Sequence, residues 1–224
     1  MGAGASVRPE IERLVDEMLE SEDVRKLVRP VLAYDIYPVI KIDREDCYLD
    51  GGTTLHGTIF SRIFKRASAL AVAVATIGPG LEARVTECFK QGHYLSGLVL
   101  DALGNASTEN LRPAVREIIS KETAKQGFQT SSSVSPGGIS WPLVEQYKLF
   151  NLVPADAINV RLTETAMMVP AKSISMVMGL GEDMPVWDAA QRCDMCSCGK
   201  GCMYRYQPEQ KCEHPDLQGS VNSL

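Results

Sequence analysis

The run ALAVAVAT, residues 69–76, places the strongest constraint on the fold of this chain. A strand with one face in water alternates apolar and polar residues, whereas a strand buried on both faces is apolar throughout. The run is also far shorter than the roughly 20 apolar residues that a helix needs to cross a bilayer, and no longer apolar run occurs. We therefore expect a sheet strand that is buried on both of its faces.

The spacing of apolar residues in the rest of the chain predicts helices in some segments and strands in others, in no regular order. We expect two helices within 9–32, where Ser21 is a candidate N-cap, and helices over 54–66, 81–91 and 142–153. A long helix should begin near 94, be interrupted near Pro113 and run on to about 125. Further strands are expected at 36–42, 158–163 and 173–181. Without a regular strand–helix–strand alternation, the pattern favours the α+β class over a doubly wound sheet.

Length and composition indicate one large domain with small appendages. The chain has 224 residues, of which 45% are hydrophobic, and its net charge of −5 argues against a nucleic-acid-binding protein. We divide it into N-terminal helices (1–34), a central domain (35–181) and a cysteine-rich tail (182–224). The N-terminus has no apolar signal region, so a cytoplasmic location, where thiols stay reduced, is expected.

The tail contains a dense group of soft metal ligands with the spacing C-x2-C-x-C-x3-C. Several thiolates within ten residues, separated by glycines that allow tight turns, suit a metal ion or an iron–sulfur cluster. A zinc ribbon usually has two separated C-x2-C pairs, so we favour a [4Fe–4S] cluster and keep zinc as the alternative. Cys198 and Cys212 compete for the fourth ligand position, and the full candidate set is Cys193, Cys196, Cys198, Cys202 and Cys212.

The two other cysteines, Cys47 and Cys88, stand alone and are expected to be structural.

Three further features can be interpreted in two ways. Glu109 falls three residues after Ala106 on a predicted apolar helix face, so it is either paired internally or available to a cationic ligand. The segment SPGG, 135–138, is either a backbone cradle for a ligand or a plain turn. Glu164 either lines a pocket or caps a turn.

Several segments together resemble a known family. SPGGISWPLVEQYKLF (135–150) and RLTETAMMVPAKSISMVMGLG (161–181) are similar to the activation, or reactivation, domain of vitamin B12-dependent methionine synthase, and most of all to stand-alone versions from anaerobes. VATIGPGLE (74–82) and LDALGNASTENL (100–111) match in the same order. The resemblance covers roughly residues 35–182.

The resemblance implies a fold, a ligand and a partner. The fold is one α+β unit with a curved, mainly antiparallel sheet flanked by helices. The ligand is S-adenosylmethionine. The partner is a corrinoid protein, whose inactive cob(II)alamin is returned to methylcobalamin by one electron and one methyl group.

The family's loop R-P-A-P-G-Y corresponds to SVSPGG, 133–138, in which Pro136 and Gly137 match. Ser133 stands where the family has an arginine that contacts the carboxylate of S-adenosylmethionine, and Gly138 stands where it has a tyrosine. The loss of a charge-assisted bond of about 1.5–3 kcal/mol predicts weaker binding of this ligand.

Two acidic residues complete the correspondence. Glu109 matches the family's acidic residue that faces the ammonium group of the ligand, and Glu164 ends the family's L-T-E motif. The resemblance therefore places Glu109, Pro136, Gly137 and Glu164 at the ligand site.

These inferences combine into one leading hypothesis. The chain is expected to be a subunit that activates a corrinoid-dependent methyltransferase such as methionine synthase, with the cluster relaying an electron from a ferredoxin or flavodoxin. Two alternatives stay open. One is a module that docks on a corrinoid protein and has a structural zinc site, and the other is an independent S-adenosylmethionine-dependent methyltransferase.

Overall fold

The structure is a computed structural model that describes residues 9–138, 140–195, 202 and 205. The chain divides into two compact units, one that ends at Val186 and one that begins at Trp187. The strands and all but one of the helices named below belong to the first unit. The helix α7 (Ala189–Met195) belongs to the second.

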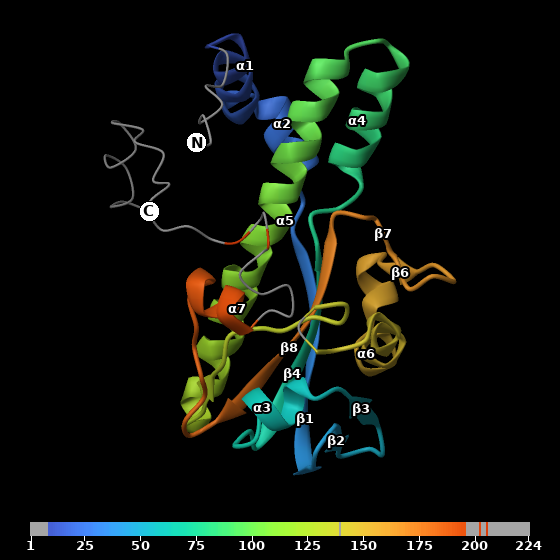
Figure 1. Ribbon diagram of the computed structural model, residues 1–224. Coiled ribbons are helices and arrows are strands. Elements are labelled where there is room, and N and C mark those ends of the chain that lie inside the picture. Colours follow the sequence, from blue (N-terminus) through green and yellow to red (C-terminus); the bar gives the residue numbers. More distant parts are fainter. Residues whose placement is uncertain (1–8, 139, 196–201, 203–204, 206–224) are drawn as a thin grey trace. The chain divides into compact units, whose positions relative to one another are not determined.

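The first unit is built on a six-stranded antiparallel sheet with the strand order β3-β2-β1-β4-β8-β5 (Figure 1). Strand β1 pairs with β4 from Val31 to Pro38 and with β2 from Val39 to Ile42, and the ladder with β2 shifts register between Val39 and Lys41. The strands are β1 (Val31–Ile42), β2 (Asp46–Leu49), β3 (Thr54–His56), β4 (Ala69–Thr76), β5 (Gln129–Thr130) and β8 (Ser173–Gly181). A separate hairpin joins β6 (Arg161–Leu162) to β7 (Met168–Val169).

Strand β4 is the predicted buried strand, with the predicted bounds. All of its eight residues are buried. It pairs with β1 from Val31 opposite Thr76 to Pro38 opposite Ala69, and with β8 from Ser173 opposite Thr76 to Leu180 opposite Ala69. An apolar strand of this kind is stable only with a layer on each face of the sheet, because both sets of side chains must leave water.

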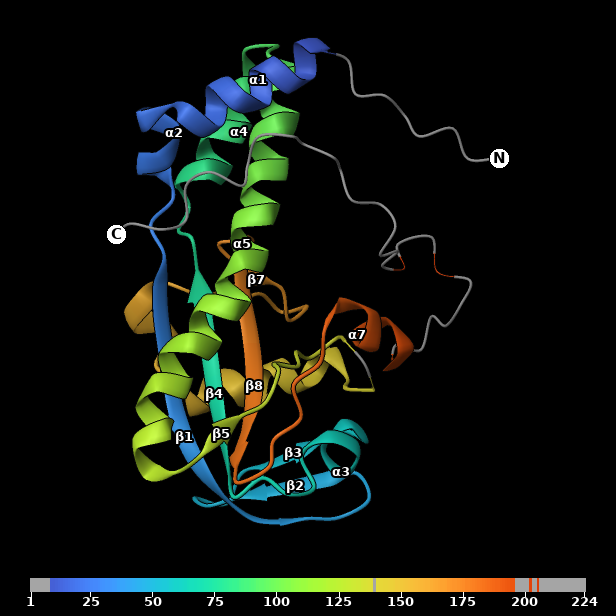
Figure 2. The same ribbon diagram turned by 90° about the vertical axis from the view of Figure 1, so that its left-hand side faces the viewer.

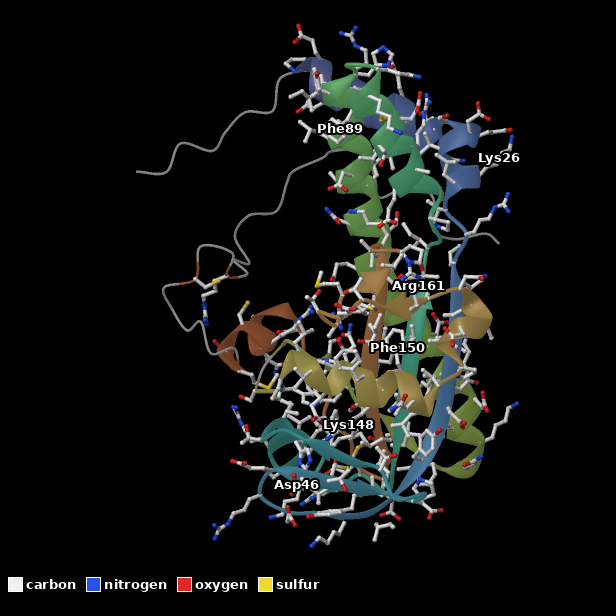
Figure 3. The ribbon with its side chains drawn as sticks, turned by 90° about the vertical axis from the view of Figure 1, so that its right-hand side faces the viewer. Lys26, Asp46, Phe89, Lys148, Phe150 and Arg161 are labelled. Carbon is white, nitrogen blue, oxygen red and sulfur yellow. The ribbon has the colours of Figure 1, made fainter. Side chains whose placement is uncertain are left out.

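The helices supply these two layers. Figure 2 shows α5 along one face of the sheet, and the segment from α6 to β7, marked by Lys148, Phe150 and Arg161 in Figure 3, covers the opposite face. Ala71 and Ala73 of β4 pack with Val115 and Ile119 of α5 in one apolar cluster. The helices are α1 (Pro9–Glu20), α2 (Glu22–Leu27), α3 (Ile59–Ile63), α4 (Gly80–Lys90), α5 (Tyr94–Thr123) and α6 (Gln146–Leu152), with 3-10 turns η1 (Ala124–Gln126), η2 (Leu143–Glu145) and η3 (Ala155–Ile158).

The observed architecture confirms the predicted α+β class with a curved, mainly antiparallel sheet flanked by helices. The predicted cap at Ser21 is also present, because its hydroxyl accepts from the Val24 amide at 3.4 Å. No helix within 9–138 or 140–195 has both the length and the apolar character that are needed to cross a membrane.

Several predicted boundaries are wrong. The strand expected over 158–163 is confined to Arg161–Leu162. Strand β1 begins at Val31, within the segment that was predicted to be helical. Residues 54–56 form β3, and the helix that follows is confined to Ile59–Ile63. Helix α5 continues through Pro113 although a proline cannot donate the bond to the carbonyl four residues earlier. Leu111, Val115 and Ile119 are buried on both sides of Pro113, and this packing offsets the missing bond.

Candidate functional site

A pocket of about 270 Å³ opens where the edge of β8 meets α5. Strand β5 pairs only with the last residues of β8, Leu180 and Gly181. Beside Ser173–Ser175, no strand within the described residues pairs with β8 on the edge away from β4. This open edge becomes a pocket wall. The lining comes from α5, the loop before η2, α6, the β6–β7 hairpin and β8, and consists of Thr108, Glu109, Arg112, Ser135, Pro136, Leu143, Gln146, Ala166, Met167, Met168, Ala171, Ser173, Ile174 and Ser175.

A series of linked hydrogen bonds lies along one side of the pocket. The guanidinium group of Arg112 donates from Nε to Glu109 Oε2 at 3.2 Å and from Nη1 to Ser135 Oγ at 3.1 Å. Ser135 Oγ in turn donates to the carbonyl oxygen of Ser175 at 2.5 Å. The Arg112 side chain is 22% exposed and that of Glu109 is 64% exposed. The contacts therefore tie α5, the loop and β8 together and present both a cation and an anion to the pocket.

A buried amide holds the part of the pocket wall that the β6–β7 hairpin forms. Gln146 Nε2 donates to the Ala166 carbonyl oxygen at 2.7 Å, and Gln146 Oε1 accepts from Ser175 Oγ at 3.0 Å. Because buried polar groups are costly without partners, these bonds fix the hairpin against α6 and β8. Gln146 thus shapes the pocket wall where α6, the hairpin and β8 meet.

The loop that contains SPGG is attached to β8 along its length. Val134 forms a two-way backbone bridge with Val177, and Ser131 Oγ accepts from the Gly179 amide at 2.8 Å. At the tip of the loop, Gly137 has a φ of +80°, and a Cβ there would lie 3.2 Å from Leu143 Cδ1. This backbone region strongly favours glycine. The segment is a constrained turn whose first residues, Ser135 and Pro136, line the pocket.

Only some of the predicted ligand-binding residues line the pocket. Glu109 and Pro136 line the pocket, and Gly137 follows directly after Pro136. Glu164 is exposed in the loop between β6 and β7. Ser133 is half-buried. Neither Glu164 nor Ser133 is among the described residues that line the pocket.

The predicted environment of Glu109 needs correction. The sequence places it on an apolar helix face with Leu95, Leu98, Val99, Ala102, Leu103 and Ala106. Of these, Val99 is buried and Leu103 is half-buried, whereas Leu95, Leu98, Ala102 and Ala106 are exposed, as is Glu109. The face of α5 that packs on the sheet is rotated from this one, and it carries Leu100, Leu111, Val115 and Ile119. Glu109 is therefore a partly solvated carboxylate at the pocket and not a carboxylate buried in the core.

Sequence reasoning missed Arg112 altogether. Its position is readable from the chain, because residues three apart lie on the same side of a helix, and Glu109 and Arg112 have this spacing. Ser175 was also within reach of the prediction, since it belongs to the expected strand 173–181. Only the fold brings Gln146 to the same place, and no local pattern in the sequence indicates it.

Four exposed apolar side chains lie on the segments that form the pocket: Leu143, Val144, Tyr147 and Met167. We call them the mouth patch. Leu143 and Met167 line the pocket itself. The Tyr147 hydroxyl donates to the Thr163 carbonyl and accepts from the Ala166 amide, so its ring is held beside the hairpin. Exposed apolar groups gathered around a pocket are typical of a surface that binds a partner.

Two of the five tail cysteines lie within the described residues. The Arg205 amide donates to the Cys202 carbonyl at 3.1 Å, its Nη1 donates to the Cys193 carbonyl at 3.5 Å, and its Nη2 contacts the Asp194 carboxylate. Arg205 thus bridges Cys193 and Cys202 through their carbonyl oxygens. Cys196, Cys198 and Cys212 lie outside the described residues, within which no group of three or more His, Cys, Asp or Glu side chains is placed to hold a metal ion.

Cys47 and Cys88 are buried, as predicted for structural residues. Burial raises the pKa of the Cys47 thiol from 9.0 to about 12, because a thiolate would lose its hydration there. Such a thiol is neutral and inert near neutral pH.

Comparison with known proteins identifies the fold. No protein-family model matches the sequence, and no curated protein matches it. Among solved structures, the fold is similar to that in "Crystal Structure of the MetH Reactivation Domain bound to AdoHcy", with a TM-score of 0.63 and 16% sequence identity. The similarity covers 80% of this chain and 67% of the other. The chain therefore has the fold of that reactivation domain.

Proposed function

We propose that this protein activates a corrinoid-dependent methyltransferase such as methionine synthase by supporting the S-adenosylmethionine-dependent methylation of inactive cob(II)alamin. The observation that carries the proposal is the pocket at the open edge of β8, which sets the Glu109 carboxylate beside the Arg112 guanidinium in a fold like that of a domain solved with AdoHcy.

The pocket supports binding of S-adenosylmethionine as the methyl donor. Glu109 would receive the ammonium group of the ligand, and the turn at Pro136 and Gly137 would lie against it. Glu164 would come to the ligand only if the β6–β7 loop bends toward the pocket, since it is now exposed outside the lining. The mixture of one charged pair with largely apolar walls is usual for a site that binds a small organic molecule.

The mouth patch supports a partner with a broad apolar face. Leu143 and Met167 line the pocket and expose apolar area there, and Val144 and Tyr147 expose more on η2 and α6. A corrinoid protein that presents its flat macrocycle there would bring the cobalt to the sulfonium group. One electron reduces the cobalt, the methyl group then passes to it from sulfur, and one S–C bond is replaced by one Co–C bond with release of S-adenosylhomocysteine.

The cysteine-rich tail supports a redox role as the finer part of the proposal. Cys193, Cys196 and Cys202, with Cys198 or Cys212, would hold a [4Fe–4S] cluster, and the Arg205 contacts hold Cys193 and Cys202 near each other. Cysteine thiolates are the ligands that such clusters use. When bound, the cluster would pass single electrons from a ferredoxin or flavodoxin to the corrinoid.

Calorimetric titration with S-adenosylhomocysteine tests the ligand site. The unaltered protein is expected to bind it, and Glu109→Gln is expected to weaken binding roughly tenfold to hundredfold through loss of a charge-assisted bond. Lys121→Gln serves as the control, because Lys121 is an exposed cation elsewhere on α5. Absence of binding to the unaltered protein would overturn the proposed function.

Metal analysis of anaerobically purified protein tests the tail. About four irons per chain, as a [4Fe–4S] cluster requires, with absorbance that bleaches on reduction, are expected. Accumulation of methylcobalamin from free cob(II)alamin, S-adenosylmethionine and a chemical reductant would extend the test to the reaction. A single zinc ion and no binding of S-adenosylhomocysteine would instead indicate the docking module with a structural metal.

A further inference from the structure

Arg112 is the cation that the pocket offers on the side of Glu109. Its guanidinium group lies 3.2 Å from the Glu109 carboxylate and bonds Ser135 at 3.1 Å. The family resemblance predicts a carboxylate-binding arginine at position 133. This chain has Ser133 there, which lies outside the pocket lining, whereas Arg112 lies within it. The two positions belong to different elements, the loop and helix α5.

The pair has the charge pattern that an amino-acid group requires. Such a group carries an ammonium and a carboxylate on the same carbon atom, so its two charges lie side by side. A carboxylate and a guanidinium that already touch can each turn to the opposite charge on a ligand without further movement of the backbone. Arginine suits the carboxylate especially well because its planar fork of N–H donors matches two oxygens.

We propose that Arg112 binds the α-carboxylate of the ligand, in place of the arginine expected at position 133, and that the pocket therefore selects ligands with an intact amino-acid group. This inference rests on the proposed function, since it concerns the same pocket. Without ligand, Arg112 neutralises Glu109. With ligand, Glu109 turns to the ammonium group and the ligand carboxylate replaces Glu109 at the guanidinium.

The surroundings of Arg112 support this role. Its side chain is only 22% exposed, so water screens its charge less than it would at the open surface. Ser135 uses its hydroxyl proton for the Ser175 carbonyl, which leaves an oxygen lone pair to accept from Arg112 Nη1. Ser135 is thus a positioning residue that holds the guanidinium at the pocket.

A panel of three ligands separates recognition of the carboxylate from other effects. S-adenosylhomocysteine has both charges, its decarboxylated analogue keeps the amine, and 5′-methylthioadenosine has neither. We expect Arg112→Gln to weaken binding of S-adenosylhomocysteine by roughly tenfold to hundredfold. The affinities of the other two ligands should change less than threefold, and the thermal midpoint should stay close to that of the Lys121→Gln control.

Each outcome of the titrations is decisive. If Arg112→Gln binds S-adenosylhomocysteine as tightly as the unaltered protein does, the inference is wrong while the proposed function stands. If the variant loses all three ligands equally, Arg112 only maintains the pocket, and the inference again fails. If the unaltered protein binds none of them, both proposals fail. Arg112→Lys, which keeps the charge without the planar fork, should fold normally and bind S-adenosylhomocysteine with intermediate affinity.

Discussion

The ammonium group of Lys172 lies 2.7 Å from Asp101 Oδ1, and so joins the start of β8 to helix α5 beside the pocket. The same group lies 2.6 Å from Asn105 Oδ1, and the Lys172 side chain is 11% exposed. Its aliphatic part packs on Gly104, where a Cβ would lie 3.0 Å from Lys172 Cε. Since Ala171 and Ser173 line the pocket on either side of Lys172, this ion pair fixes the wall that they form.

We predict that Lys172→Met lowers the free energy of unfolding by about 1–2 kcal/mol, because the charge-assisted bonds are lost while the packing on Gly104 is kept. Asp101 is half exposed and can turn to water, which limits the loss. Urea denaturation measures the difference. Lys121→Met, at a 75% exposed site on the same helix, should change stability by less than about 0.5 kcal/mol, and equal losses in both variants would contradict the assigned role of Lys172.

Cys47 is expected to resist alkylation in the folded protein. Burial raises its pKa to about 12, so at pH 8 the reactive thiolate is absent and the thiol is out of reach. Iodoacetamide treatment followed by peptide mass spectrometry should leave Cys47 unlabelled in buffer and label it in denaturing urea.

The same shift predicts a dependence of stability on alkaline pH. The folded pKa of Cys47 lies above the unfolded value of 9.0, so its contribution is present below pH 9 and is lost as the pH rises toward 12. Cys47→Ala should flatten this part of the stability curve. Rapid labelling of Cys47 in the folded protein at pH 8 would show that the site is more open than the structure indicates.

His56 and Asp46 form a second testable pair, at the end of the sheet that Figure 3 marks with Asp46. The hydrogen bond from His56 holds the pKa of the Asp46 carboxyl below its ordinary value of 3.8. The pair therefore stabilises the folded state above that value, and the effect is lost as the pH falls. In His56→Gln, an NMR titration of Asp46 should show a higher pKa, and an unchanged pKa would mean that the bond does not form in solution.

The parts of the fold that could be predicted are those in which local pattern and tertiary burial agree. Strand β4 and strand β8 are apolar along their length and are buried along their length, so their bounds were readable. The start of strand β1 could not be predicted in this way, because Val31 and Leu32 continue the apolar spacing of the preceding helix. Only pairing with Thr76 and Ala75 of β4 makes them a strand.

The site shows the same limit. Glu109 and Pro136 were identified from the sequence and line the pocket, but Glu164 was identified by the same means and does not. A hairpin loop can carry a motif residue toward a pocket or away from it, and periodicity contains no information about that direction. Arg112 could not be predicted from apolar periodicity, because it lies on the polar side of α5. The pocket is lined by that polar side.

Strand β8 has a further consequence, which follows from its place in the chain. Its first residues, Ser173–Ser175, line the pocket, its last residue is Gly181, and the second compact unit begins only a few residues later at Trp187. The cysteine-rich unit is therefore covalently joined to the unit that holds the pocket, so the two are always present in equal numbers and neither has to bind the other from solution.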